Sequence, residues 1–301
     1  MSLRSESGSL IAVKDHESAG AITYWRLSGP VALDVLRRAW LNEGLDEELL
    51  PAAPEPEIAL RRAVNAQAGR RRLVRPLSRR GAWVIQDEDI VESNGRQTAR
   101  HTDVCVIRWT DAPGQPFSIE SADAPFGVYT QVHDAVIAEY QSALGQLDQH
   151  DVSAWLVERA SALDATGLRD TGGIYFVPQP GVATWRKMIA ALTVATGDTH
   201  KVFRIAALRD QDAVAAILDA ITQEASQEIV KFQEVINSGE VGARGLRARG
   251  KDCENVLAKV ERYENLVGSR LDGLRANIEA MQASIAAAVM IAQAEAERNA
   301  A

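Results

Sequence analysis

The C-terminal third of the chain carries the pattern that most limits how this protein can fold. From about Gln211 to Ala301 the strand-forming runs stop, and apolar residues recur at helical spacing. In the last part they alternate steps of three and four over three heptads, as a and d positions do. This seam comprises Leu271, Leu274, Ile278, Met281, Ile285, Ala288 and Ala292. A helix with such a stripe needs a partner helix to bury it.

The partner helix can belong to the same chain or to another one. Helices are predicted over Gln211–Asn237, over Ala243–Val267 and after Gly268. The heptad phase slips upstream of the seam, where apolar residues follow steps near four. The glycines between and within the runs favour a folded-back helical hairpin or bundle over one continuous rod. A dimer satisfies the same pattern, so self-association and packing within the chain both stay open.

Residues 21–210 are predicted to form an α+β head, preceded by a flexible tail over residues 1–20. Ala21–Leu27 is rich in β-forming residues and predicts a strand, and Ser28–Pro30 is predicted to open a helix. A further helix is expected from about Glu57 to Ala66. An antiparallel meander follows, with strands expected at Arg72–Leu77, Ala82–Gln86, Val104–Thr110 and Phe117–Ser121.

Residues 125–210 then predict the order α-α-β-α-β. Asp151 is expected to cap the second helix, and Ile174–Val177 forms a short buried strand that Pro178 closes. The whole chain is therefore predicted as a mixed head followed by a helical or coiled-coil arm over residues 211–301. Its fold class is α+β.

Composition bears on where the protein is located in the cell and on what it can bind. The formal net charge of −8 argues against a general nucleic-acid coat. No apolar run reaches the length of a membrane span, and the N-terminus lacks the apolar core of a signal peptide. Cys105 and Cys253 have no partner motif, so they predict free thiols in a reducing cytosol. We therefore expect a cytoplasmic protein with no membrane partner.

One segment of the head is strongly basic. Arginines flank a predicted strand and precede Trp83, an arrangement that can follow a nucleic-acid backbone. The alternative is a solvated hairpin, paired in part with the acidic cluster Asp87, Glu88, Asp89 and Glu92, which is itself predicted to be a solvated turn. The arginines of this segment are Arg70, Arg71, Arg72, Arg75, Arg79 and Arg80.

Familiar catalytic and cofactor motifs do not fit the chain. Gly245–Asp252 resembles a phosphate-binding loop, but Asp252 stands where a hydroxyl must hold Mg²⁺, and the string lies in helical sequence. The five histidines lack metal-ligand spacing, and no nucleophile elbow or dinucleotide fingerprint occurs. We expect no cofactor and no metal. An enzyme is disfavoured, although a site assembled by the fold remains an alternative.

Several segments together resemble an uncharacterised family of bacteria and phages. They are Arg75–Leu77 after the basic run, Leu168–Pro178 with its Gly-Gly-Ile-Tyr-Phe-Val-Pro end, the segment Arg204–Asp212, and the helical tail. The resemblance implies a phage or mobile-element context and transfers no catalytic residues.

The leading hypothesis is a non-enzymatic interaction protein. Its head would recognise a protein partner, and its arm would self-associate or dock. Nucleic-acid binding through the arginine segment is the alternative, and an enzyme of unrecognised type is the third.

Overall fold

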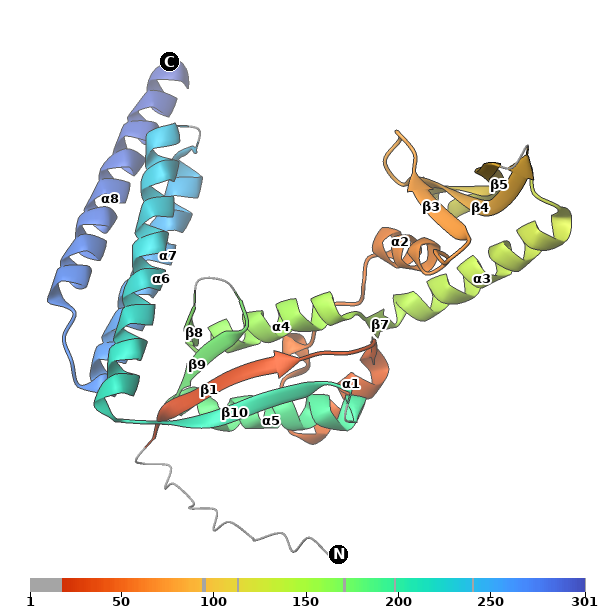
Figure 1. Ribbon diagram of the computed structural model, residues 1–301. Coiled ribbons are helices and arrows are strands. Elements are labelled where there is room, and N and C mark those ends of the chain that lie inside the picture. The colour runs from red at the N-terminus through yellow and green to blue at the C-terminus, as the bar shows by residue number, and fades with distance from the viewer. Residues whose placement is uncertain are drawn as a thin grey trace, which may run out of the picture. The chain divides into compact units, whose positions relative to one another are not determined.

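The computed structural model describes residues 18–93, 96–112, 114–169, 172–197, 199–239 and 241–300 (Figure 1). The predicted tail over residues 1–20 therefore lies outside the described residues as far as residue 17. Antiparallel sheets combined with helices confirm the α+β class.

The chain divides into two compact units. Unit 1 comprises the chain up to Arg26, Leu156–Ala190 and the chain from His200 onward, and unit 2 comprises Leu27–Trp155 and Ala191–Thr199. This division differs from a head that ends at residue 210. The first strand pairs with strands that come after residue 166, and this draws the central sheet into the same unit as the C-terminal helices.

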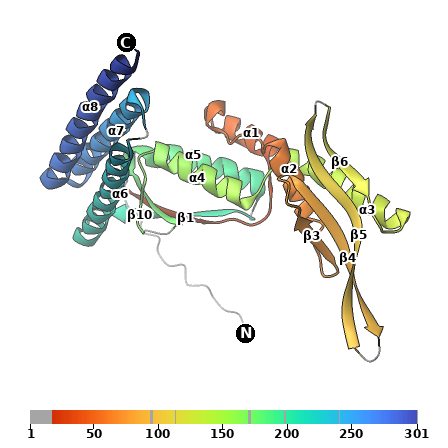
Figure 2. The same cartoon turned by 90° about the horizontal axis from the view of Figure 1, so that it is seen from above.

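Unit 2 is built around a four-stranded sheet. Its elements are β2 (Val31–Ala32), α1 (Leu33–Asn42), the short 3-10 helix η2 (Glu47–Leu49), α2 (Pro56–Asn65), β3 (Arg72–Pro76), β4 (Ala82–Ser93), β5 (Arg96–Ala112), β6 (Gln115–Ser121), α3 (Phe126–Leu144) and β7 (Gln146–Leu147). The order β3-β4-β5-β6 with antiparallel neighbours confirms the predicted meander (Figure 2). Its core joins apolar residues of the sheet to α2 and α3.

Two strands of the meander are longer than expected. The acidic cluster was predicted as a solvated turn, but it belongs to β4. Its residues pair across to β5, where Asp89 lies opposite Arg100 and Glu88 lies opposite His101. Opposite charges on facing strands favour this pairing, which local composition alone does not reveal. The turn prediction for this cluster is therefore wrong.

Two helix starts also differ from the sequence prediction. Ser28–Pro30 does not open a helix, because α1 begins only at Leu33, after the short strand β2. Gly29 has φ +80°, which places it in a turn. The helix α4 (Gln149–Ala162) is preceded by a reciprocal capping box, in which the Asp148 and Asp151 carboxylates each accept from the other residue's backbone N–H. Asp151 is thus one half of the cap.

Unit 1 joins a four-stranded sheet to three long helices. Its elements are β1 (Ser18–Arg26), β8 (Thr166–Gly167), β9 (Ile174–Pro178), α5 (Gln179–Thr196), β10 (Lys201–Leu208), α6 (Gln211–Ser238), α7 (Ala243–Val267) and α8 (Asp272–Ala300). The boundary between the units runs through α4 and α5. The α-α-β-α-β order and the three C-terminal helices were both predicted. The strand order is β10-β1-β9-β8, with every neighbouring pair antiparallel.

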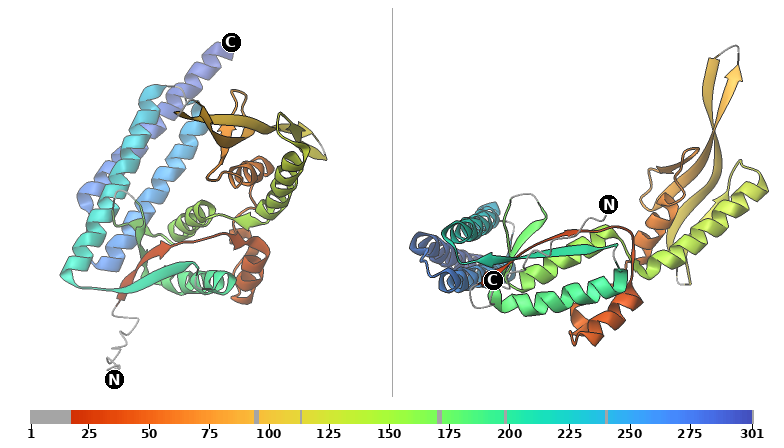
Figure 3. Two further views of the ribbon diagram at one scale, coloured as in Figure 1. Left: turned by 45° about the vertical axis from the view of Figure 1, so that its right-hand side comes forward. Right: turned by 60° about the horizontal axis from the view of Figure 1, so that its bottom comes forward.

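The two faces of this sheet pack against different helices. The helix α5 runs along one face of the sheet (Figure 3). There Trp185 donates its indole N–H to the Thr23 hydroxyl at 3.1 Å, and both side chains are buried. On the other face Phe176 belongs to a core that contains residues of α6, α7 and α8. The Phe176 ring meets the ring of Tyr263 edge-on at 6.0 Å. The bundle of the three helices therefore packs directly on the sheet.

Gly20 allows the sheet to close under this aromatic ring. A Cβ at Gly20 would lie 2.8 Å from the Phe176 ring carbon Cζ and closer still to the Val177 carbonyl oxygen. No real Cβ tolerates such distances, so a side chain here must displace the backbone of β9 or the ring above it.

We predict that Gly20→Ala destabilises the protein by about 1–3 kcal/mol, because it overpacks a buried contact between strands. Urea unfolding followed by circular dichroism measures the change. Gly273→Ala is the matched control, since Gly273 lies in α8 with no atom near its missing Cβ. The control should be neutral or slightly stabilising. Equal stability of both variants would contradict the role of Gly20.

Candidate functional site

The arginine segment lies along β3, an edge strand of the unit 2 sheet. Arg72 forms a bidentate pair with Asp87, with Nε–Oδ1 at 2.6 Å and Nη2–Oδ2 at 3.0 Å. The hydrogen bond to Asp87 raises the pKa of Arg72. Arg70, Arg71, Arg75, Arg79 and Arg80 are exposed.

Carboxylates accompany the first part of this segment. An open hollow at the start of β3 is lined by Arg70, Arg71 and Arg72 together with Asp87, Glu88 and Asp89. Three cations beside three anions nearly cancel, and a phosphate backbone entering here would meet both signs. The geometry therefore gives little support to a nucleic-acid groove at this end of β3.

The heptad seam of α8 is used inside the chain. Leu274, Ile278, Met281 and Ile285 are buried in the same core as residues of α6 and α7. Leu271 is half-buried against this core, and Ala288 and Ala292 are half-buried. Gly250, from the string that resembles a phosphate-binding loop, lies within α7, where its missing Cβ would contact Ile285 Cγ2 at 3.7 Å. That glycine thus permits close helix packing.

A polar junction ties the bundle to the loop before β8. Lys259 of α7 donates to Glu224 of α6 at 2.6 Å and to the Ala165 carbonyl at 2.7 Å. The Thr166 hydroxyl donates to the other Glu224 oxygen at 2.6 Å. Each of these groups therefore has a partner where the two helices meet the loop.

Asp164 is the second part of the junction. Its carboxylate accepts two hydrogen bonds from Arg262, both at 2.7 Å, and its carbonyl accepts from the Tyr263 hydroxyl, also at 2.7 Å. Among the described residues Asp164 is the only non-glycine residue with positive φ, at 62°. Aspartate enters this region more readily than most residues, and the turn directs its backbone toward α7. Burial raises the pKa of Tyr263, which keeps its hydroxyl protonated as the donor.

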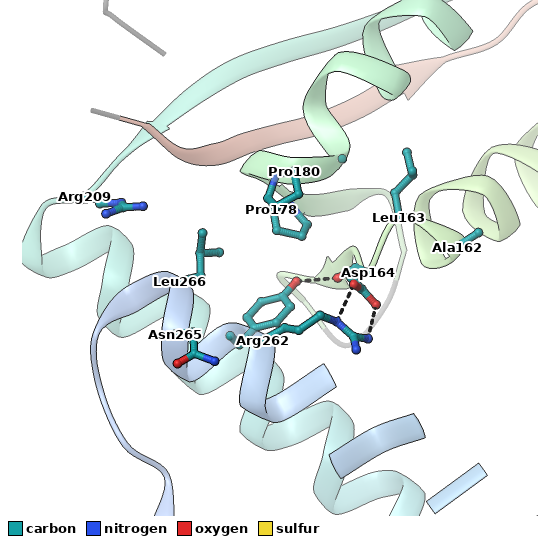
Figure 4. A pocket seen from close by; sticks show the side chains of 11 residues that line it. Ala162, Leu163, Asp164, Pro178, Pro180, Arg209, Arg262, Asn265 and Leu266 are labelled. Atoms are coloured by element: carbon teal, nitrogen blue, oxygen red, sulfur yellow. Dashed lines mark hydrogen bonds and ion pairs between the residues drawn. The ribbon is translucent and has the colours of Figure 1, made fainter. Parts of the chain in front are cut away.

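A cavity of about 520 Å³ lies beside this junction (Figure 4). The end of α4, the start of α5, the end of β10 and the last turns of α7 all contribute to its wall. Much of the lining is apolar, and the polar groups are Asp164, Arg209, Arg262 and Asn265. The apolar lining includes Leu163, Pro178, Pro180, Tyr263 and Leu266.

The first turn of α5 lies unusually close to the end of α4. A Cβ at Gly181 would be 3.1 Å from both Cβ and the carbonyl oxygen of Leu163. Glycine at this position therefore lets the cavity wall form from two adjacent helix ends.

Sequence reasoning did not identify this cavity. Its polar residues lie at positions 164, 209, 262 and 265, and no local spacing joins them. Two sequence segments, Leu168–Pro178 and Arg204–Asp212, contribute Pro178 and Arg209 to its wall. Those segments were noted for their resemblance to a family.

The edge strand β10 is the other exposed feature of unit 1. Phe203, Ile205 and Leu208 keep 38%, 53% and 42% of their surface exposed, which is unusual for three large apolar residues on one strand. Phe203 stacks on Tyr24 of β1 with ring centroids 4.8 Å apart. The outer edge of β10 is not paired with another described strand.

The described part of the chain offers no clustered metal ligands and no exposed thiol. There, no group of three or more histidine, cysteine, aspartate or glutamate residues could hold a metal ion. Both cysteines are free and buried. Burial raises the pKa of Cys105 to about 11 and also raises that of Cys253, which keeps both thiols protonated and weakly reactive.

No helix among the described residues is long and apolar enough to cross a membrane.

Comparison with known proteins identifies a family. A model described as a family of unknown function (DUF6744) matches residues 20–296, so the chain belongs to that family. The expected membership of an uncharacterised family is confirmed, while an origin in bacteria or phages stays a prediction. No curated protein and no solved structure matches the chain.

We predict that Lys259→Met lowers the free energy of unfolding by about 2 kcal/mol, because Glu224 and the Ala165 carbonyl both lose their partner. The matched control is Lys231→Met, which breaks a Lys–Glu pair of the same 2.6 Å length on the exposed face of α6. The control should change stability by less than about 0.5 kcal/mol. Urea unfolding of both variants provides the comparison, and equal effects would argue against the junction.

Proposed function

We propose that this member of a family of unknown function is a non-enzymatic interaction protein that self-associates through the outer edge of β10. The observation that carries the proposal is the exposure of Phe203, Ile205 and Leu208 on an unpaired edge strand. The seam of α8 was the expected surface for self-association. Because that seam packs on α6 and α7, the β10 edge is the better candidate.

The backbone of β10 supports strand addition. The Phe203 carbonyl accepts from the Thr23 hydroxyl at 2.9 Å, so it points toward β1. Backbone groups alternate along an antiparallel strand, and those of Ala206 therefore point outward. A second strand alongside β10 would supply their hydrogen-bond partners, as in other complexes formed by strand addition.

The side chains favour a second copy of the chain as the occupant. An antiparallel pair centred on Ile205 places each Ile205 opposite its copy and each Phe203 opposite Ala207. Arg204 then lies opposite Ala206, so this arginine does not face its own copy. Such a two-fold arrangement is self-complementary, which is the usual form of a homodimer interface.

Other features support a binding role over catalysis. The two thiols are buried with raised pKa values, and their free state supports a reducing, cytoplasmic location as part of the proposal. Nucleic-acid binding through the arginine segment stays a prediction with weaker support, because Asp87, Glu88 and Asp89 accompany its first half.

We predict that the full chain, of 32.7 kDa, forms a dimer and that Ile205→Glu returns it to a monomer. The substitution places two carboxylates opposite each other and should weaken the dimer at least about 100-fold, since it also removes buried apolar surface. Light scattering after size-exclusion chromatography over a range of concentrations measures the mass.

The matched control is Ile90→Glu, which changes an isoleucine that is 65% exposed on β4 of unit 2. It should leave the dimer intact. Ala206→Pro removes an outward N–H of β10 and should weaken the dimer without adding charge. A wild-type monomer at every concentration, or a dimer that Ile205→Glu does not weaken, would refute self-association through β10.

A further inference from the structure

The cavity beside the polar junction has the size and form of a ligand site. Its volume of about 520 Å³ falls within the range of small-molecule pockets, which is roughly 300–1,000 Å³. Such pockets combine apolar walls with a few polar groups that orient the ligand. Leu163, Pro178, Pro180 and Leu266 supply the apolar walls (Figure 4). Tyr263 also lines the cavity.

The cavity keeps one cation whose charge is not balanced nearby. Arg262 is neutralised by its bidentate pair with Asp164, the one carboxylate of the lining. Arg209 also lines the cavity, and its guanidinium makes no ion pair within the described residues. The neighbouring Asp210 carboxylate accepts from the Ala213 N–H at 2.8 Å, where it caps α6. The local charge balance therefore favours an anion.

The remaining polar groups of the cavity are also compatible with a negatively charged ligand. The Tyr263 hydroxyl is already used, because it donates to the Asp164 carbonyl. Asn265 presents a neutral amide. Pro180 and Gly181 belong to the first turn of α5, an 18-residue helix whose positive dipole end adds to the field of Arg209.

We propose that this cavity binds a small organic anion, with an apolar body against Pro178, Pro180 and Leu266 and a single carboxylate or phosphate at Arg209. The guanidinium can hold either group with two parallel hydrogen bonds. The site lies at the end of β10. The proposal rests on the cavity and does not depend on the exposed edge of that strand.

Three naphthyl probes of similar shape and one simple anion test the proposal on the full-length chain by isothermal titration calorimetry. They are 2-naphthoate, 2-naphthyl phosphate, the neutral 2-naphthamide and inorganic phosphate. At least one naphthyl anion should bind about tenfold or more tightly than the amide, and inorganic phosphate should bind more weakly than naphthyl phosphate. The ratio of the affinities for 2-naphthoate and 2-naphthyl phosphate distinguishes a carboxylate site from a phosphate site.

Two variants locate the binding. Arg209→Met keeps most of the aliphatic stem and should weaken the better anion about tenfold or more, bringing its affinity toward that of the amide. Arg270→Met is the matched control, an exposed arginine between α7 and α8 that does not line the cavity, and it should leave the affinity within about twofold. Leu266→Trp should fill the cavity and weaken every naphthyl probe.

Three outcomes would overturn the proposal. They are equal affinity for the amide and both anions, unchanged affinity in Arg209→Met, and no binding of any probe at about millimolar concentration. Circular dichroism of each variant shows whether it is folded. A folded Arg209→Met protein with wild-type affinity places the anion elsewhere. These readouts do not depend on the oligomeric state, so they separate a failed cavity from a failed dimer interface.

Discussion

The hydrogen bonds that Asp164 makes with α7 fix the helical bundle against the loop before β8. Arg262 binds the Asp164 carboxylate and Tyr263 binds its carbonyl, while Lys259 reaches the Ala165 carbonyl one residue later. These charge pairs contribute modestly to net stability, because solvent screens the exposed Arg262–Asp164 pair and desolvation offsets much of the attraction between Lys259 and Glu224. Their main effect is on geometry, because they fix the position and the orientation of α7 relative to the loop before β8. The cavity lies directly beside this junction, and Asp164, Arg262 and Tyr263 all line it.

The same placement explains why the helical arm does not need another chain. Core contacts of Phe176 and Ala207 with the bundle continue the burial that the α8 seam begins. The phase slip between the apolar sets of α7 and α8 fits an antiparallel turn at Gly268, which has φ +72°. A continuous coiled coil would have carried one phase through this point. The stripe of α8 therefore has its partner helices within the chain.

Local sequence patterns located most of the helices and strands but did not locate the site. Periodicity placed α7 over Ala243–Val267, as predicted, and turn residues separated the strands of the meander. The acidic residues of β4 were misassigned because their partners, Arg100 and His101, come from the next strand. Asp164, Arg209 and Arg262 are separated by tens of residues, and only the packing of a bundle on a sheet brings them to one cavity. No spacing in a single sequence indicates that these three residues line one cavity.

Some arginines are paired with carboxylates of the same chain, whereas others can still bind a ligand. Arg72 is held by Asp87 and Arg262 by Asp164, and Arg275 contacts both Glu261 and Glu264. Guanidinium groups suit these roles because they bind carboxylates in a fixed fork. An arginine-rich segment therefore cannot be read as a binding surface until its carboxylate partners are counted. By that test the densest basic run, at the start of β3, is largely balanced, while the single Arg209 beside an apolar cavity keeps a charge that a ligand can meet.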